Sequence, residues 1–104
     1  MIKFETVTDG LGKISMFRVS GHAFYAKSGK DIVCAAVSAA VWMAINGIEK
    51  QQLAKLSVKQ EDGLVECFIS PERTESADAI LQSLLLFMKE LAANYKKNVF
   101  LVQG

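Results

Sequence analysis

Residues 21–38 read GHAFYAKSGKDIVCAAVS, and this stretch sets the layout of the whole chain. Residues 21–30 are mostly small or polar, which is typical of a loop. Asp31 has the side chain of a good helix N-cap, because its oxygen can accept the unpaired N–H groups of a first helical turn. Residues 32–45 are then apolar with a single exception. The stretch therefore predicts a loop followed directly by a buried helix.

The predicted helix is apolar on nearly every side, so it needs cover on nearly every side. In a chain of 104 residues, this calls for a sheet on one face and a second helix or a second subunit on another. Asn46 and Gly47 are residues that often end a helix, and a continuation through Ile48 and Glu49 is the alternative.

Two stretches before the loop are expected to form a β-hairpin. Residues 2–7 alternate apolar and polar side chains, which is typical of a strand. Residues 8–12 contain an Asp-Gly pair and favour a turn, and residues 13–20 would return as the second strand. The apolar residues of this second strand change parity midway, which indicates either burial on both faces or a bulge.

The chain after the helix predicts a second hairpin, a second helix and a last strand. Residues 56–60 and 64–70 predict the hairpin, and the Ser-Pro-Glu sequence at residues 70–72 favours a helix entry or the turn before one. Apolar residues spaced alternately four and three apart predict an amphipathic helix from Thr74 to Lys97. Residues 99–102 predict the closing strand.

These elements define the expected fold class. Their order is β-β-α-β-β-α-β, a single α+β domain over residues 1–104 with a largely antiparallel sheet and two helices on one side. Hydrophobic residues make up 51% of the chain and charged residues 22%, which is the profile of a packed globular protein. A chain of this length can bury a core without support from a metal or a disulfide.

Composition also excludes several classes of function. The net charge is +1 and the basic residues are scattered, whereas nucleic-acid binding needs a concentrated basic face. The N-terminal sequence MIKFETVT lacks the apolar core of a signal peptide, and the apolar run at residues 32–45 is shorter than the about 20 residues that cross a bilayer. Two cysteines and one histidine give no zinc pattern. We expect a cytoplasmic protein with no metal, no cofactor and no direct contact with nucleic acid or membrane.

One pair of residue types suggests reactivity. If the helix starts after Asp31, Cys34 is its third residue, where the positive end of the helix dipole favours a thiolate over a thiol. His22, on the preceding loop, could accept the thiol proton and later protonate a leaving amine. Backbone N–H groups around Cys34 are candidates for binding an oxyanion. Ser38 lies one turn further along, where its hydroxyl could orient the thiolate or a water.

Each of these residues also has a purely structural explanation. A free cysteine is often core filler, and a histidine after a glycine can be a turn residue. A helical serine commonly bonds the carbonyl one turn back, and an N-cap needs no further role. Phe24 and Tyr25 are either loop anchors that pack on the core or walls of a substrate pocket. Cys67 lies in the middle of a predicted strand, and we interpret it as structural.

The same residues carry a resemblance to a known family. Residues 21–38, together with Asn46-Gly47, resemble the signature of the ribosomal-processing cysteine protease family, often called Prp. The match consists of Gly21-His22-Ala23, Tyr25-Ala26, Gly29 and the unbroken run Asp31-Ile32-Val33-Cys34-Ala35-Ala36-Val37-Ser38. Such a run is far more specific than an isolated cysteine and histidine. The chain departs from the family at Ala40, where a leucine is common, which affects packing rather than chemistry.

The resemblance implies a cytoplasmic homodimer. It also implies a cysteine endopeptidase that removes an N-terminal extension from a large-subunit ribosomal protein. By position, the family's nucleophile falls on Cys34 and its general base on His22, with Asp31 and Ser38 as supporting residues. The family's loop before the cysteine is thought to move over bound peptide, and Gly21 and Gly29 would give it that freedom.

Two alternatives remain at this point. A β-α-β-β-α-β core is a split β-α-β pattern shared by many small sensing and docking domains, so a non-enzymatic dimeric binding or regulatory module is one alternative. The other keeps the cysteine–histidine pair but changes the substrate to another acyl or thioester group.

Overall fold

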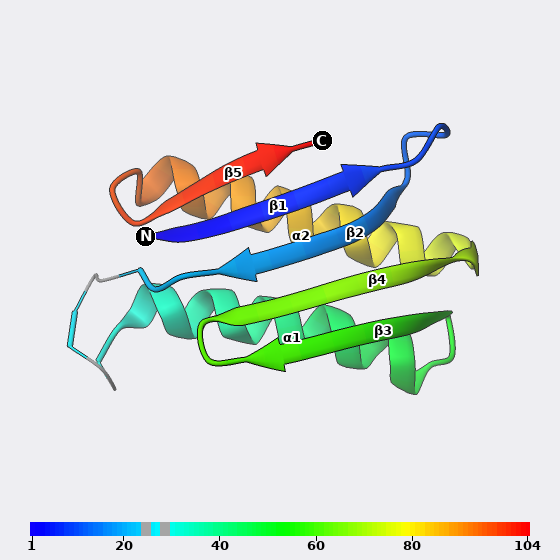
Figure 1. Cartoon of the computed structure of the whole chain (residues 1–104), viewed down its shortest axis with the longest axis horizontal. Helices are drawn as coiled ribbons and strands as arrows, with labels where there is room; N and C mark the ends of the chain where they lie inside the picture. The colour runs from blue at the N-terminus through cyan, green and yellow to red at the C-terminus, as the bar shows by residue number, and fades with distance from the viewer. Residues whose placement is uncertain (24–25, 28–29) are drawn as a thin grey trace.

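The chain folds into a five-stranded sheet with two helices packed on it (Figure 1). The elements are β1 (Ile2–Thr8), β2 (Ile14–Ser20), α1 (Ile32–Lys50), β3 (Ala54–Glu61), β4 (Leu64–Arg73), α2 (Glu75–Asn94) and β5 (Val99–Gln103). This computed structural model describes residues 1–23, 26–27 and 30–104, so the expectations for Phe24, Tyr25 and Gly29 lie outside the described residues. The predicted α+β fold and its order of elements are confirmed.

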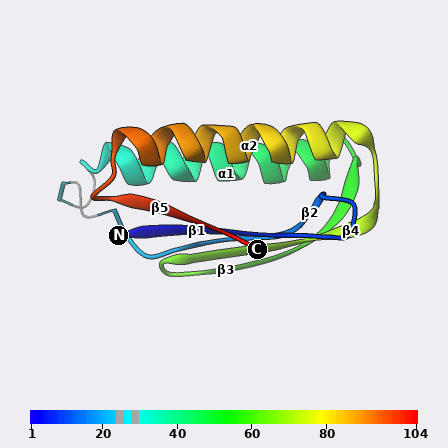
Figure 2. The same cartoon turned by 90° about the horizontal axis from the view of Figure 1, so that it is seen from above.

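The strands lie in the order β3-β4-β2-β1-β5. Three of the four neighbouring pairs are antiparallel, and β1 and β5 are parallel. A parallel pair needs a long connection, and here the chain between β1 and β5 includes both helices. Figure 2 shows that α1 and α2 lie side by side on one face of the sheet. The largely antiparallel sheet is therefore as predicted, and in the described part of the chain its other face carries no helix.

The parity change in β2 is caused by a β-bulge. Val7 pairs with Met16 and Thr8 with Ile14, so Ser15 is an extra residue without a partner in β1. Its hydroxyl donates a hydrogen bond to the Val7 carbonyl at 3.1 Å. The bulge lets Ile14 and Phe17, three positions apart, both point into the core.

Several predicted boundaries were wrong by a few residues. Residues 70–72 do not enter a helix; they belong to β4, which runs on to Arg73. The pairing of β3 with β4 is irregular there, since Ala54 pairs with Arg73 but Leu56 with Ile69. A proline is tolerated where a ladder is interrupted in this way, because its missing N–H costs no strand hydrogen bond.

The helices also differ at their ends. Helix α1 takes the longer alternative and continues through Gly47 to Lys50. Helix α2 begins after Thr74, whose hydroxyl caps it by accepting the Ala77 N–H at 3.2 Å, and it ends at Asn94 instead of near Lys97.

Because it continues to Lys50, helix α1 is long and apolar enough to cross a membrane, judged by length and composition alone. In the fold, one face of it is buried in the core; its buried residues are Val33, Val37, Val41, Ala44, Ile45 and Ile48. Burial in the core accounts for the apolar residues on this face of α1.

A buried arginine at the end of β4 contacts the first hairpin and the start of α2. The Arg73 side chain is 2% exposed and donates to the Ile14 carbonyl. It lies 3.5 Å from carboxylate oxygens of both Asp9, in the β1–β2 loop, and Asp78, in the first turn of α2. One guanidinium thus joins β4, the first hairpin and the start of α2.

Replacing Arg73 by Met should lower the free energy of unfolding by about 2–4 kcal/mol, because Asp78 would lose its buried cationic partner. Urea denaturation measures the change. Lys59→Met is the matched control: its ion pair with Glu61 is 60% exposed on both sides, so it should cost less than about 0.5 kcal/mol. Equal costs for the two variants would contradict this assignment.

Candidate active site

The start of α1 is fixed by Asp31. Its backbone is extended, and its Oδ1 atom accepts the N–H groups of Val33 and Cys34, both at 3.0 Å. Asp31 is therefore the N-cap, as predicted, and Cys34 is the third residue of the helix. The Cys34 N–H is occupied by this cap, and the binding of an oxyanion by backbone N–H groups around Cys34 stays a prediction.

The Cys34 sulfur is in a polar position at the edge of the core. The residue is partly exposed, and its Sγ accepts a hydrogen bond from the Ala23 N–H at 3.3 Å. Ala23 itself is 1% exposed. The N–H groups of Val33 and Cys34 are occupied by Asp31, so the Ala23 N–H is the backbone donor that the sulfur receives. Cys34 thus packs against the core and also accepts one backbone hydrogen bond at its sulfur.

Gly21 directs the chain from β2 toward this sulfur. Its φ of 89° is open only to glycine without strain, and a Cβ there would lie 2.3 Å from the Met1 carbonyl oxygen. Its N–H donates to the Gly63 carbonyl at 2.9 Å. A glycine is therefore required at position 21 for the path of the backbone, and the freedom of the loop to move over bound peptide stays a prediction.

His22 lies beside the turn between β3 and β4. A Cβ on Gly63 would be 3.2 Å from His22 Nε2, so the bare backbone of Gly63 makes room for the imidazole. Sequence reasoning had identified Gly63 only as a turn residue. A hairpin glycine carries no local sign of what packs on it from a distant segment.

A cavity of about 530 Å³ brings the candidate residues together. His22, Cys34 and Ser38 all line it, as does Gly21. Asp31 lies behind them as the helix cap. The structure thus places the histidine, which precedes the loop, and the cysteine, which follows it, at one site.

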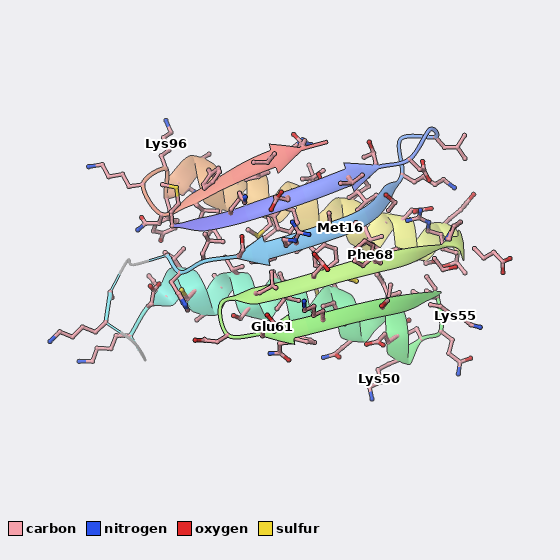
Figure 3. The ribbon with its side chains drawn as sticks, viewed as in Figure 1. Met16, Lys50, Lys55, Glu61, Phe68 and Lys96 are labelled. Carbon is pink, nitrogen blue, oxygen red and sulfur yellow. The ribbon has the colours of Figure 1, made fainter. Side chains whose placement is uncertain are left out.

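The rest of the cavity combines an apolar wall with a polar rim. The wall includes Val19, Val37, Trp42, Leu64 and Val65, and the rim consists of Gln60, Glu61 and Asp62 at the turn between β3 and β4. Figure 3 labels Glu61 at this end of β3, which is also the end where α1 begins. Such a surface can hold a short extended peptide with apolar side chains inward and its polar backbone toward the rim.

Asn98 contacts the segment that carries His22, which sequence reasoning did not anticipate. Its side-chain Nδ2 donates to the Ala23 carbonyl at 2.9 Å. It lies between α2 and β5, far from the loop in sequence, and follows two lysines that suggest only a solvated helix end. No local pattern could have connected it with Ala23.

Cys67 is clearly separate from this site. It is 0% exposed in the middle of β4, which confirms the interpretation that it is structural. Burial, assisted by the negative charge of Glu49, raises the pKa of the Cys67 thiol to about 12. In the part of the chain that the structure describes, no group of three histidine, cysteine or acidic side chains is arranged to hold a metal ion.

Comparison with known proteins adds independent evidence. Residues 1–100 match the family model of the cysteine protease Prp. The ribosomal processing cysteine protease Prp of Bacillus subtilis is 30% identical over 92 residues, which cover 83% of this chain and 82% of that one.

Solved structures of Prp proteases also superpose on this chain. A crystal structure of the ribosomal processing protease Prp from S. aureus, in complex with a covalently linked product peptide, superposes with a TM-score of 0.94 at 25% identity and covers both chains completely. A second structure of the S. aureus protease, in complex with a substrate peptide, superposes with a TM-score of 0.88 at 24% identity, again over both complete chains.

Cys67 should make the stability of the fold depend on pH in the alkaline range. Because the Cys67 pKa is raised from 9.0 to about 12 by folding, the unfolded chain loses this proton first. The stabilisation from Cys67 is therefore complete below pH 9 and is lost as the pH rises toward 12. Urea denaturation at several pH values, with Cys67→Ala as reference, measures the difference. If the wild type and the variant show the same slope above pH 9, the inference is wrong.

Proposed function

This chain belongs to the cysteine protease Prp family, the ribosomal processing cysteine proteases, and we propose that Cys34 is its nucleophile and His22 its general base. The observation that carries the proposal is the shared cavity: Cys34 and His22 line it together, and the sulfur accepts a backbone hydrogen bond from the loop. Membership in a protease family decides against the non-enzymatic binding module.

The chemistry follows from these two groups. His22 takes the proton of Cys34, and the thiolate attacks the carbonyl carbon of the scissile peptide bond. The tetrahedral intermediate collapses as His22 protonates the leaving amine, which leaves a thioester on Cys34. His22 then removes a proton from water, which attacks the thioester and releases the acid and the free thiol.

Ser38 and Asp31 support this reaction in different ways. Ser38 lines the cavity one helical turn beyond Cys34, so its hydroxyl can orient the thiolate or the attacking water. Asp31 acts through the helix, because its two hydrogen bonds determine where α1 starts and hence where the sulfur points. Gly21 sets the direction of the histidine segment. For Phe24, Tyr25 and Gly29, we propose contact with bound peptide.

The proposed substrate is an N-terminal extension of a large-subunit ribosomal protein. The S. aureus relatives are in complex with product and substrate peptides, and the cavity described above suits a short unfolded peptide. We place the reaction in the cytoplasm, where ribosomes assemble. Another acyl or thioester substrate would use the same two residues, but the aligned relatives are peptidases.

Replacing Cys34 by Ala should reduce cleavage of such an N-terminal peptide by at least about 10³-fold, because no other group can form the thioester. Mass spectrometry of the products measures the rate. Cys67→Ala is the matched control and should retain activity in its folded fraction. A Cys34→Ala protein that cleaves at the normal rate would disprove the mechanism. Persistence of the untrimmed ribosomal protein in cells that lack this enzyme tests the substrate.

We also propose that the protein is a homodimer joined through its helices. A groove of about 510 Å³ runs between α1 and α2, and its lining is apolar except for one serine: Ala36, Ala39, Ala40, Met43, Ser83, Leu84 and Phe87. Met43 and Leu86 are 63% and 66% exposed. Small alanines beside protruding large side chains make the surface complementary to a second copy of itself across a two-fold axis. The apolar helix called for a second helix or a second subunit; α2 covers part of α1, and the proposed second subunit would cover the groove that remains.

Met43→Glu should convert the dimer to a monomer in gel filtration at micromolar concentration, because a carboxylate would be buried in an apolar interface. The matched control is Phe68→Glu. Phe68 is 49% exposed on the sheet face that carries no helix (Figure 3), so its replacement should leave the dimer intact. A wild-type monomer, or dissociation by the control instead, would contradict the assignment.

A further inference from the structure

The segment Gly21-His22-Ala23 is held at both of its ends by residues from distant parts of the chain. At the upstream end, the Gly21 N–H donates to the Gly63 carbonyl at 2.9 Å. At the downstream end, Asn98 Nδ2 donates to the Ala23 carbonyl at 2.9 Å. His22 lies between these two anchors. Its backbone position is therefore determined by the β3–β4 turn on one side and by Asn98 on the other.

The Asn98 anchor also acts on the sulfur. Ala23 accepts the Asn98 amide with its carbonyl and donates its own N–H to Cys34 Sγ at 3.3 Å. Both peptide groups share the Ala23 Cα, so holding the carbonyl restricts rotation of the N–H. A hydrogen bond to sulfur depends strongly on direction. Losing the Asn98 amide would therefore make the positions of both the Ala23 N–H and His22 less well defined.

Asn98 is itself firmly placed. Its carbonyl accepts the Ile2 N–H at 2.8 Å, and its N–H donates to the Tyr95 carbonyl at 2.9 Å. These backbone bonds join the end of α2 to the start of β1, and they do not involve the side chain. A substitution that removes only the amide donor leaves them in place.

From this geometry, and on the basis of the function proposed above, we propose that Asn98 is a positioning residue of the active site. Its amide fixes the Ala23 peptide so that the N–H stays on the Cys34 sulfur and His22 stays at the cavity. Among the described residues, those that line the cavity do not include Asn98. It therefore acts through Ala23 and not on the substrate, and its loss should affect kcat far more than KM.

The test compares Asn98→Asp with Asn94→Asp. The first replaces the amide donor by a carboxylate of the same shape, and the second makes the same change of charge at the exposed end of α2. Asn98→Asp should lower kcat about tenfold, the effect of about 1.4 kcal/mol expected from one hydrogen bond, and change KM less than about twofold. It should also slow alkylation of Cys34 by iodoacetamide several-fold, which needs no peptide. Asn94→Asp should match the wild type in all three measurements.

A second measurement separates positioning from a folding defect. Lowering the pH from 8 to 4 should raise the activity of Asn98→Asp relative to the wild type, because the carboxyl is substantially protonated near its ordinary pKa and then regains a donor for the Ala23 carbonyl. Asn98→Ala has no such group and should show no rescue. Should Asn98→Asp not fold, Asn98→Ala alone is compared with the wild type in kcat, KM and alkylation per folded molecule.

The outcomes distinguish this proposal from the function on which it depends. An inactive Cys34→Ala with unchanged kcat and alkylation in the Asn98 variants overturns only the role of Asn98. If the loss of activity in the Asn98 variants matches their unfolded fraction, the positioning role of Asn98 is overturned as well. An active Cys34→Ala overturns the proposed mechanism instead.

Discussion

The site depends on one carboxylate that accepts two N–H groups. Asp31 caps α1, and this cap determines at which residue the helix begins. Successive residues of an α-helix are turned by about 100°, so a start one residue later would turn Cys34 away from the cavity. The cap also places a negative charge near the helix start, which opposes a thiolate. The Ala23 N–H donates a hydrogen bond to the sulfur and so favours a thiolate. The histidine segment therefore supplies a stabilisation that the capped helix end alone does not.

Local signals in the sequence were sufficient for most of the architecture. The Asp31 cap, the two hairpin turns and the spacing of apolar residues in α2 predicted every element and their order, because each depends on neighbours in the chain. The parity change in β2 revealed an irregularity but not its kind. Only the partner strand shows that Ser15 is the extra residue. The sequence left the last residue of α1 undecided for a similar reason. A glycine such as Gly47 often ends a helix when only its neighbours in the chain are considered, but here packing keeps it inside α1.

The site could be predicted only in part. Cys34, His22, Asp31, Ser38 and Gly21 lie in one contiguous stretch, so motif and helix register identified them together. What was missed comes from elsewhere in the chain. Gly63 makes room for an imidazole 41 positions upstream of it, and Asn98 reaches Ala23 across 75 positions. Contacts of that range depend on how the sheet and helices assemble, and a single sequence carries no local trace of them.

The parallel pairing of β1 with β5 has a consequence for synthesis on the ribosome. Because β1 precedes both helices and β5 follows α2, this edge of β1 stays unpaired until α2 has been made. The nascent chain exposes its cysteine early but acquires the framework around it late. The hydrogen bonds that Asn98 makes with Ala23 and Ile2 therefore form only after α2 has been made.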